Sequence, residues 1–325
     1  TETRHHRGMR DVFFSTSVVS CLCVKKSLFS LVLSVVATSF VFAEGSETYL
    51  SGDTWRGFCD WRVAKKEKQT VIPEKVKEGD TIFVKYDQLE RFQTQFLHRI
   101  KNRFILISPN SGSGADNPLP GKFAPLLSSE KIAAWFVQNI DRAPSEKVIP
   151  LPIGIANHGW EHGNTALLDK YRSLAKKIEA RKTGIYVNFS VQTNPQEREP
   201  CFQYFSKLKG AKVAGSRSFE EYLQDLSDSV FVVSPPGHGL DCHRTWEALL
   251  MGCYPIVKHS TLDPLFEDLP VVLVSDWSEV TEQFLEEKKK EFSQKQWKME
   301  KLLAPYWFEK VKAVSHAIKR GRSDE

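Results

Sequence analysis

Residues 230–257 read VFVVSPPGHGLDCHRTWEALLMGCYPIV. The apolar run 230–233 predicts a buried strand, and the Pro- and Gly-rich residues 234–239 predict a loop. A helix is expected over 242–251, and a second buried strand over 254–257. Strand, loop, helix and strand in this order make a βαβ unit, which predicts an α/β fold with a parallel sheet.

The same alternation extends through the rest of the chain. Further strands are expected at 81–85, 103–107, 185–189, 212–214 and 271–274. Helices are expected at 87–102, 128–137, 164–182, 200–209, 218–228 and over most of 278–320. The rhythm restarts near residue 183, so the sequence predicts two facing Rossmann-like domains with parallel sheets, over 44–182 and 183–325.

The start of the helix at 242–251 has the features of a phosphate site. In an open parallel sheet, ligands bind beyond the carboxyl ends of the strands, and a helix N-terminus preceded by glycines receives phosphate through its N–H groups. Arg244 offers a fork that matches phosphate oxygens, and Glu247, on the same helix face, suits ribose hydroxyls. These residues predict a nucleotide diphosphate site; the alternative is an ordinary ion pair between Arg244 and Glu247.

The same run resembles the donor-site segment of exostosin-type glycosyltransferases. That family shows the pattern R-x-x-E-A-x-x-x-G-C-x-P-[VI], which falls here on Arg244, Glu247, Ala248, Gly252, Cys253, Pro255 and Ile256. Residues 105–111, 135–139 (a "WF-x-x-N" helix in the related transferases) and 151–157 also resemble elements of these enzymes. What remains after residue 43 is short for such an enzyme, which puts the acceptor class in doubt.

The resemblance implies a GT-B glycosyltransferase. It implies a nucleotide-sugar donor in the C-terminal domain, an acceptor largely on the N-terminal domain, and inversion at the anomeric carbon without an essential metal. A last helix often crosses back onto the N-terminal domain in this architecture, and we expect that here. The expected partners are a UDP- or GDP-linked sugar and a glycan or glycoconjugate acceptor, with no other cofactor.

An inverting transfer needs a base for the acceptor hydroxyl and positive groups for the leaving diphosphate. The candidate bases are Asp116 and His158, and Asn110 and Asn157 are candidates for binding the acceptor; each could instead support its own turn. The candidate donor-binding residues are Ser234, Gly237, His243, Arg244, Glu247 and Lys258. Trp246 is expected in the core rather than under a sugar.

The N-terminal segment 1–43 has the pattern of a targeting signal. Lys25 and Lys26 precede an uncharged apolar stretch over 27–43 that ends in Ala43. This pattern predicts a secretory signal peptide or a signal anchor. The expected location is the secretory pathway or cell envelope, with membrane association through 27–43 or export after cleavage.

Composition excludes several other classes of protein. The net charge is only +5, without a concentrated basic face, so no nucleic-acid partner is expected. The six cysteines form no C-x-x-C pair, so zinc binding is not expected, and disulfides or free thiols both stay open. No G-x-G-x-x-G follows the early strands, which disfavours a dehydrogenase. Two alternatives remain: a non-catalytic sugar- or nucleotide-binding protein of the same fold, and a two-lobed binding protein of the periplasmic type.

Overall fold

The computed structural model describes residues 49–64, 70–109, 121–140 and 144–321. The described residues belong to one compact unit. The predicted targeting segment 1–43 and the candidates Asn110 and Asp116 lie outside the described residues. Within them, no helix is both long and apolar enough to span a bilayer.

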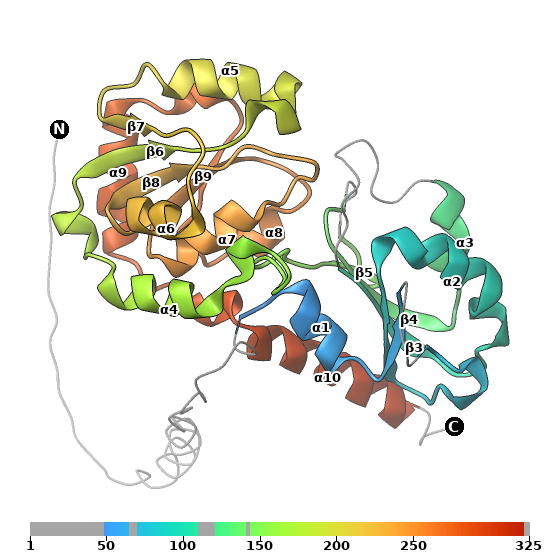
Figure 1. Cartoon of the computed structure of the whole chain (residues 1–325). Coiled ribbons are helices and arrows are strands. Elements are labelled where there is room, and N and C mark those ends of the chain that lie inside the picture. The colour runs from blue at the N-terminus through green and yellow to red at the C-terminus, as the bar shows by residue number, and fades with distance from the viewer. Residues whose placement is uncertain (1–48, 65–69, 110–120, 141–143, 322–325) are drawn as a thin grey trace, which may run out of the picture. The chain divides into compact units, whose positions relative to one another are not determined.

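The described strands form two parallel five-stranded sheets (Figure 1), which confirms the predicted α/β class. The first sheet follows chain order: β1 (Trp61–Val63), β2 (Asp80–Val84), β3 (Phe104–Ser108), β4 (Ile132–Val137) and β5 (Val148–Pro150). The second has the order β10 (Val272–Val274), β9 (Tyr254–Lys258), β8 (Ser229–Val233), β6 (Thr183–Val187), β7 (Ala211–Val213).

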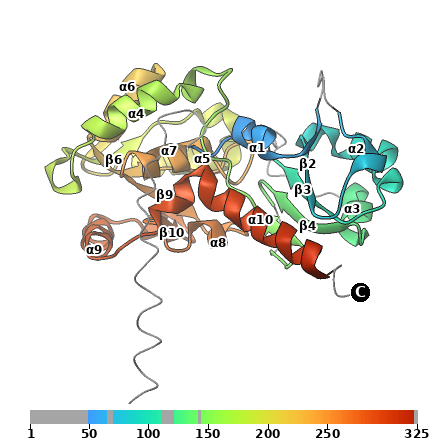
Figure 2. The same cartoon turned by 90° about the horizontal axis from the view of Figure 1, so that it is seen from below.

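The strand order of the first sheet explains which helices cover it. Parallel connections are right-handed, so a sheet whose strands are added in one direction carries all its connecting helices on one face. These helices are α2 (Leu89–Gln95) and α3 (Ala124–Ser128), and the opposite face is covered by α1 (Gly52–Phe58) and α10 (Ala304–Gly321), as Figures 1 and 2 show.

Helix α10 returns to the first sheet from the far end of the chain. Its Phe308 ring stacks on Phe58 of α1 with centroids 4.2 Å apart, and Ser315 Oγ donates to the Gly79 carbonyl at 2.7 Å. The expectation that the last helix crosses back onto the first half is therefore confirmed.

The second sheet changes its direction of addition at β6. Strand β7 pairs with one side of β6, and β8, β9 and β10 continue from the other side. Right-handed connections therefore place α5 (Pro195–Phe205) on one face, and α6 (Phe219–Ser227) and α7 (His243–Leu250) on the other. Helix α9 (Glu282–Ser293), which follows the last strand, shares an apolar cluster with α5. The core follows this division, because Phe205 and Phe292 share one apolar cluster while Leu223 and Leu249 belong to another.

This change of direction creates a switch point. The two strands on either side of it, β6 and β8, are paired in register, with Tyr186 opposite Val232. Beyond their carboxyl ends the chain leaves in opposite directions, which opens a crevice where ligands bind in α/β proteins.

Two further helices complete the described fold, α4 (Thr165–Leu174) and α8 (Asp263–Phe266). Single 3-10 turns lie at Pro73–Lys75, Tyr86–Gln88, Leu97–Arg99, Gly121–Phe123, Glu161–Gly163, Ile178–Ala180, Val191–Thr193, Trp277–Glu279 and Met299–Leu302. Helix α4 precedes residue 182 yet packs against α6, and one apolar cluster contains both Ile107 and Leu249. The limits 44–182 and 183–325 stay a prediction.

The expected helix over 128–137 is wrong, because residues 132–137 are strand β4. Helix α3 ends at Ser128, the residue at which the expected helix begins. Strand β4 lies between β3 and β5 and is buried on both faces, so it needs a continuous apolar run rather than alternation. Such a run fits a helix equally well by periodicity alone.

Other limits differ by a turn or more. Helix α4 ends at Leu174 instead of 182, and α5 starts at Pro195, where proline is well placed in a first turn, instead of Pro200. The cysteines of the described part, Cys59, Cys201, Cys242 and Cys253, are free thiols, so they form no disulfide with one another.

Candidate functional site

A cavity of about 660 Å³ lies at the switch point of the second sheet and reaches the first half of the chain. From the first half it is lined by Lys85, Asn139, Ile153, Ala156, Asn157, Trp160 and His162. From the second half it is lined by Asn188, Thr193, Arg198, Arg217, Tyr222, Gly237, His238, Gly239, Asp241, Cys242, His243, Arg244 and Glu247. The size suits a nucleotide-sized ligand.

Arg198 of α5 holds the loop that precedes α7, residues 234–239, by hydrogen bonds to its backbone. The Arg198 guanidinium donates to the carbonyls of Pro236 and Ser190, both at 2.8 Å. A Cβ at residue 237 would lie 2.7 Å from Arg198 Nη2, so a larger residue there would require this guanidinium to shift. No ion pair to Arg198 is formed within the described part of the chain, so its charge is met by backbone oxygens and, at 3.8 Å, by the sulfur of Cys242. Burial lowers the pKa of Arg198, but an arginine stays charged at neutral pH.

Arg244 and Glu247 line the cavity one helical turn apart, and neither is satisfied. Arg244 Nε and Glu247 Oε1 are buried without a hydrogen-bond partner among the described residues. They form no ion pair with each other, so the alternative of an ordinary intrahelical pair does not hold. The guanidinium of Arg244 lies 5.9 Å from the centre of the Phe189 ring, and that of Arg198 lies 5.6 Å from it. Two guanidinium groups without carboxylate partners thus flank one ring.

Glu247 is only 3% exposed, and burial raises its pKa to about 7, although the charge of Arg244 opposes the shift. Burial also raises the pKa of Tyr222, whose hydroxyl lies near this carboxylate but makes no hydrogen bond of good geometry. Buried polar atoms are nearly always hydrogen-bonded in proteins. Three unsatisfied atoms on the wall of one cavity therefore point to a polar ligand.

The raised pKa of Glu247 gives a stability prediction. An unfolded Glu ionises near pH 4.5, whereas the buried one ionises near 7, so the folded state is penalised as pH rises through this interval. Glu247→Gln removes this penalty and should raise the free energy of unfolding at pH 8 by up to about 3 kcal/mol. Denaturant unfolding from pH 4 to 8 measures it, with the exposed Glu286→Gln as control. Identical pH dependence in the two variants would contradict the assignment.

His243 is the first residue of α7 and has a defined tautomer. Its Nδ1 lies 2.8 Å from the Gly154 carbonyl oxygen, and because a carbonyl only accepts, Nδ1 carries the hydrogen. Burial lowers the pKa of the imidazole, so the neutral form prevails at pH 7. The structure thus places His243 in the cavity as a neutral ring, and the positive charge comes from the two arginines.

Gly154 has to be glycine. Its φ is +64°, and a Cβ there would lie 2.0 Å from the Leu50 carbonyl oxygen. This conformation presents the carbonyl that orients His243.

Asp241, just before α7, joins the two halves of the chain. Its carboxyl group accepts from Ile153 N at 2.8 Å and from Trp246 Nε1 at 2.8 and 2.9 Å, while its own N–H donates to Asn139 Oδ1 at 2.7 Å. Burial raises its pKa to about 7, and the hydrogen bonds oppose that shift. Trp246 is buried, as predicted, and serves the core rather than a sugar.

The remaining predicted residues divide between the cavity and its surroundings. Gly237 and Asn157 line it, and Asn157 Oδ1 also accepts from Asp53 N at the start of α1. His158 points away: its imidazole Nδ1 lies 3.4 Å from the Asp53 carboxylate, and its side chain is half exposed. Ser234 Oγ is buried 2.8 Å from Thr245 Oγ1, and Lys258 Nζ pairs with Glu197 at 2.8 Å; neither lines the cavity.

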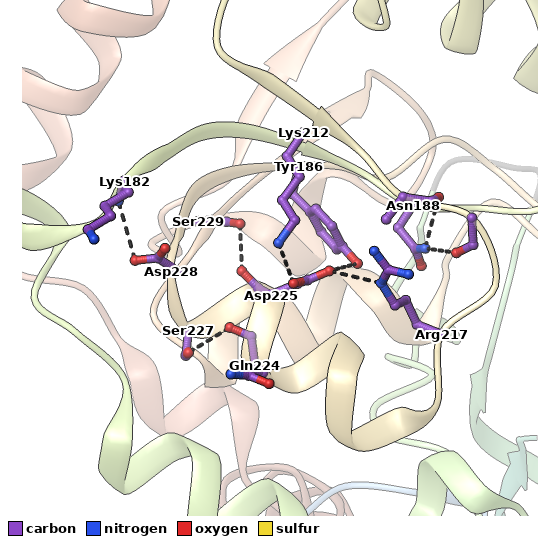
Figure 3. A network of polar contacts seen from close by, with 12 residues as sticks. Lys182, Tyr186, Asn188, Lys212, Arg217, Gln224, Asp225, Ser227, Asp228 and Ser229 are labelled. Atoms are coloured by element: carbon purple, nitrogen blue, oxygen red, sulfur yellow. Dashed lines mark hydrogen bonds and ion pairs between the residues drawn. The ribbon is translucent and has the colours of Figure 1, made fainter.

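The sequence did not reveal Arg198, Tyr222, Trp160 and the network that neutralises Arg217. The Asp225 carboxylate accepts a hydrogen bond from Tyr186 Oη at 3.0 Å (Figure 3). It also forms ion pairs with Lys212 and, at 3.3 Å, with Arg217. Arg217 lines the cavity, but its charge is compensated, whereas the charges of Arg198 and Arg244 are not.

Trp160 lies in the cavity lining with 71% of its surface exposed. None of these positions belongs to a pattern with fixed spacing.

Comparisons with known proteins agree with a glycosyltransferase-like second half. Residues 188–318 match the family model described as the RXYLT1 C-terminal domain, a xylosyltransferase-related family; this is less than half of the chain. The match includes the loop, α7 and both guanidinium groups. It does not confirm the exostosin-type resemblance.

Solved structures are similar only at a distance. One is the crystal structure of AviGT4, a glycosyltransferase involved in avilamycin A biosynthesis, with a TM-score of 0.32 and 9% identity over 74% of this chain and 80% of that one. Another is the GtfA/B complex, with a TM-score of 0.30 and 12% identity over 75% of this chain and 55% of that one. Likeness at this level carries no argument about function. No curated protein matches the chain.

Proposed function

We propose that this protein is a glycosyltransferase that moves a sugar from a nucleotide-sugar donor to a hydroxyl of a glycan or glycoconjugate. One observation carries the proposal: Arg244 and Glu247 place unsatisfied polar atoms in a cavity at the switch point of a parallel sheet. The match to a xylosyltransferase-related family over the same residues supports it.

The cavity offers a place for each part of the donor. The diphosphate lies at the start of α7, where Arg198 and Arg244 supply charge and the loop containing Gly237 gives access to backbone N–H groups. A ribose hydroxyl donates to Glu247, and ligand binding provides the partner that Glu247 Oε1 lacks. The acceptor enters from the first half, along Asn157 and the exposed Trp160.

The transfer inverts the anomeric centre and needs no metal ion in this proposal. Two uncompensated guanidinium groups and a helix N-terminus can hold the charge of a leaving diphosphate. Transfer in 5 mM EDTA should then stay within about two-fold of that in Mg²⁺, because each guanidinium carries a full charge at neutral pH. A loss of activity that Mg²⁺ or Mn²⁺ restores would contradict metal independence.

A donor panel tests the function directly. Calorimetry with the full chain measures binding of UDP- and GDP-linked sugars, with UDP-xylose first because of the family match. Release of the nucleoside diphosphate measures both hydrolysis of the donor and transfer to glycan acceptors. Binding without hydrolysis or transfer would favour the alternative, a non-catalytic protein of the same fold, and no binding by folded protein would reject both.

The predicted location fits an enzyme of glycan synthesis. Secretory-pathway or cell-envelope residence, with membrane association through residues 27–43, rests on the sequence pattern of that segment. Fractionation of cells that express the full chain, followed by carbonate extraction, separates a cleaved from a retained segment. A full-length protein in the soluble cytosolic fraction would contradict the prediction.

A further inference from the structure

We propose that His243 is the general base that takes the proton from the acceptor hydroxyl; this rests on the proposed function. His158, the candidate base that directly follows the lining residue Asn157, points out of the cavity toward Asp53. Two imidazoles do line the cavity, those of His162 and His243. They differ in how they are held.

His243 is fixed with its basic nitrogen available. The Gly154 carbonyl holds Nδ1–H at 2.8 Å, so the lone pair of the neutral ring resides on Nε2. Nε2 has no hydrogen-bond partner among the described residues, and the ring lines the cavity. Position 154 admits only glycine, because any Cβ would collide with Leu50, so the carbonyl that orients the ring is itself fixed.

The position of His243 also suits the reaction. It precedes Arg244 directly, and its ring reaches across to the backbone of the first half. The ring therefore lies between the expected diphosphate and the expected acceptor. The Asp241 carboxylate accepts a hydrogen bond from Trp246 Nε1. Besides burial, His162 and Arg244 disfavour the protonated form of the His243 ring.

The step balances without a further reactant. The acceptor oxygen forms a bond to the anomeric carbon while its proton moves to His243 Nε2. The bond between the anomeric carbon and the diphosphate oxygen breaks, and its electron pair leaves with the nucleoside diphosphate beside Arg244. The imidazolium then returns its proton to water.

His162 is the competing candidate. Its ring packs against Phe219, with centroids 5.0 Å apart, and lies 6.4 Å from Tyr222, on the side of Glu247. No hydrogen bond fixes either ring nitrogen among the described residues. It therefore belongs to the wall expected to hold the nucleoside.

The test compares His243→Asn with His162→Asn in the full chain. The Asn amide can retain the hydrogen bond to Gly154 but offers no basic nitrogen at the position of Nε2. With the best donor of the panel, His243→Asn should lower kcat by about 100-fold or more and leave the donor Kd within three-fold. His162→Asn should instead raise the donor Kd, because His162 belongs to the wall expected to hold the nucleoside, and should lower kcat by less than about ten-fold.

The pH profile of the wild type provides a test that needs no variant. Transfer should fall at acid pH as His243 becomes protonated, with a midpoint below 6.5, and this limb should be absent from the residual activity of His243→Asn. A His243→Asn enzyme with kcat within three-fold of wild type, or one that loses donor binding in parallel, would overturn the inference. So would a wild-type profile that has no acid limb anywhere in the pH range in which the protein stays folded. A wild type that binds no donor would instead reject the proposed function.

Discussion

Arg244→Ala should weaken donor binding by at least about 100-fold while the protein stays folded. Arg244 belongs to the first turn of α7 and lines the cavity, and its Nε is buried without a hydrogen-bond partner among the described residues. Charge-assisted hydrogen bonds contribute about 1.5–3 kcal/mol each, and a diphosphate accepts more than one of them from an arginine fork. Arg244→Lys should lower the affinity for the donor nearly as much, because an ammonium group lacks the fork of N–H donors of a guanidinium.

Arg217→Ala is the matched control for this experiment. Arg217 also lines the cavity, but Asp225 already pairs with it at 3.3 Å. Its loss should change the donor Kd by less than about five-fold, since the ligand gains little from a compensated charge. Calorimetry and circular dichroism on all three variants measure binding and folding separately. Equal losses in Arg217→Ala and Arg244→Ala would contradict a specific role for Arg244.

Gly154→Ala should destabilise the protein by at least about 3 kcal/mol, because it adds backbone strain to a collision with backbone atoms. The added Cβ would lie 2.0 Å from the Leu50 carbonyl oxygen, and φ is +64°. Leu50 is buried, so neither segment can move without disturbing the core. Denaturant unfolding at pH 7 measures the loss.

Gly159→Ala is the control in the same loop. A Cβ at Gly159 meets nothing within 4 Å, so this variant should stay within about 0.5 kcal/mol of the wild type. Similar stability of the two variants would show that residue 154 is not confined as described. The experiment also probes the site, because a shift of Gly154 would release the ring of His243.

Local sequence patterns predict those strands, loops and helices whose structure depends on neighbouring residues in the chain. The strand, loop and helix around residues 230–257 were predicted because apolar runs, prolines and glycines fix them within a few residues. Strand β4 was mistaken for a helix because its six residues are apolar on both faces, and only its neighbours β3 and β5 decide between the two.

The site shows the same division between local and distant effects. Arg244 and Glu247 were found because their spacing places them on one helix face. Arg198 was not, because it acts through carbonyls of residues 235 and 236, far along the chain. His158 is a candidate base by sequence, whereas His162, four residues further on, lines the cavity. The turn closed by Trp160 N to Asn157 O and by Gly163 N to Trp160 O sends one toward Asp53 and the other into the cavity.

The consecutive strand order of the first sheet has a consequence for biosynthesis. All five strands are made by residue 150, but α10, which covers one face together with α1, begins only at Ala304. A nascent chain therefore carries an apolar sheet face that stays partly uncovered until the last helix has left the ribosome, which is the kind of surface that chaperones bind. The first half is synthesised first but completed last, and a truncation within α10 should damage the half of the protein most distant from it in sequence.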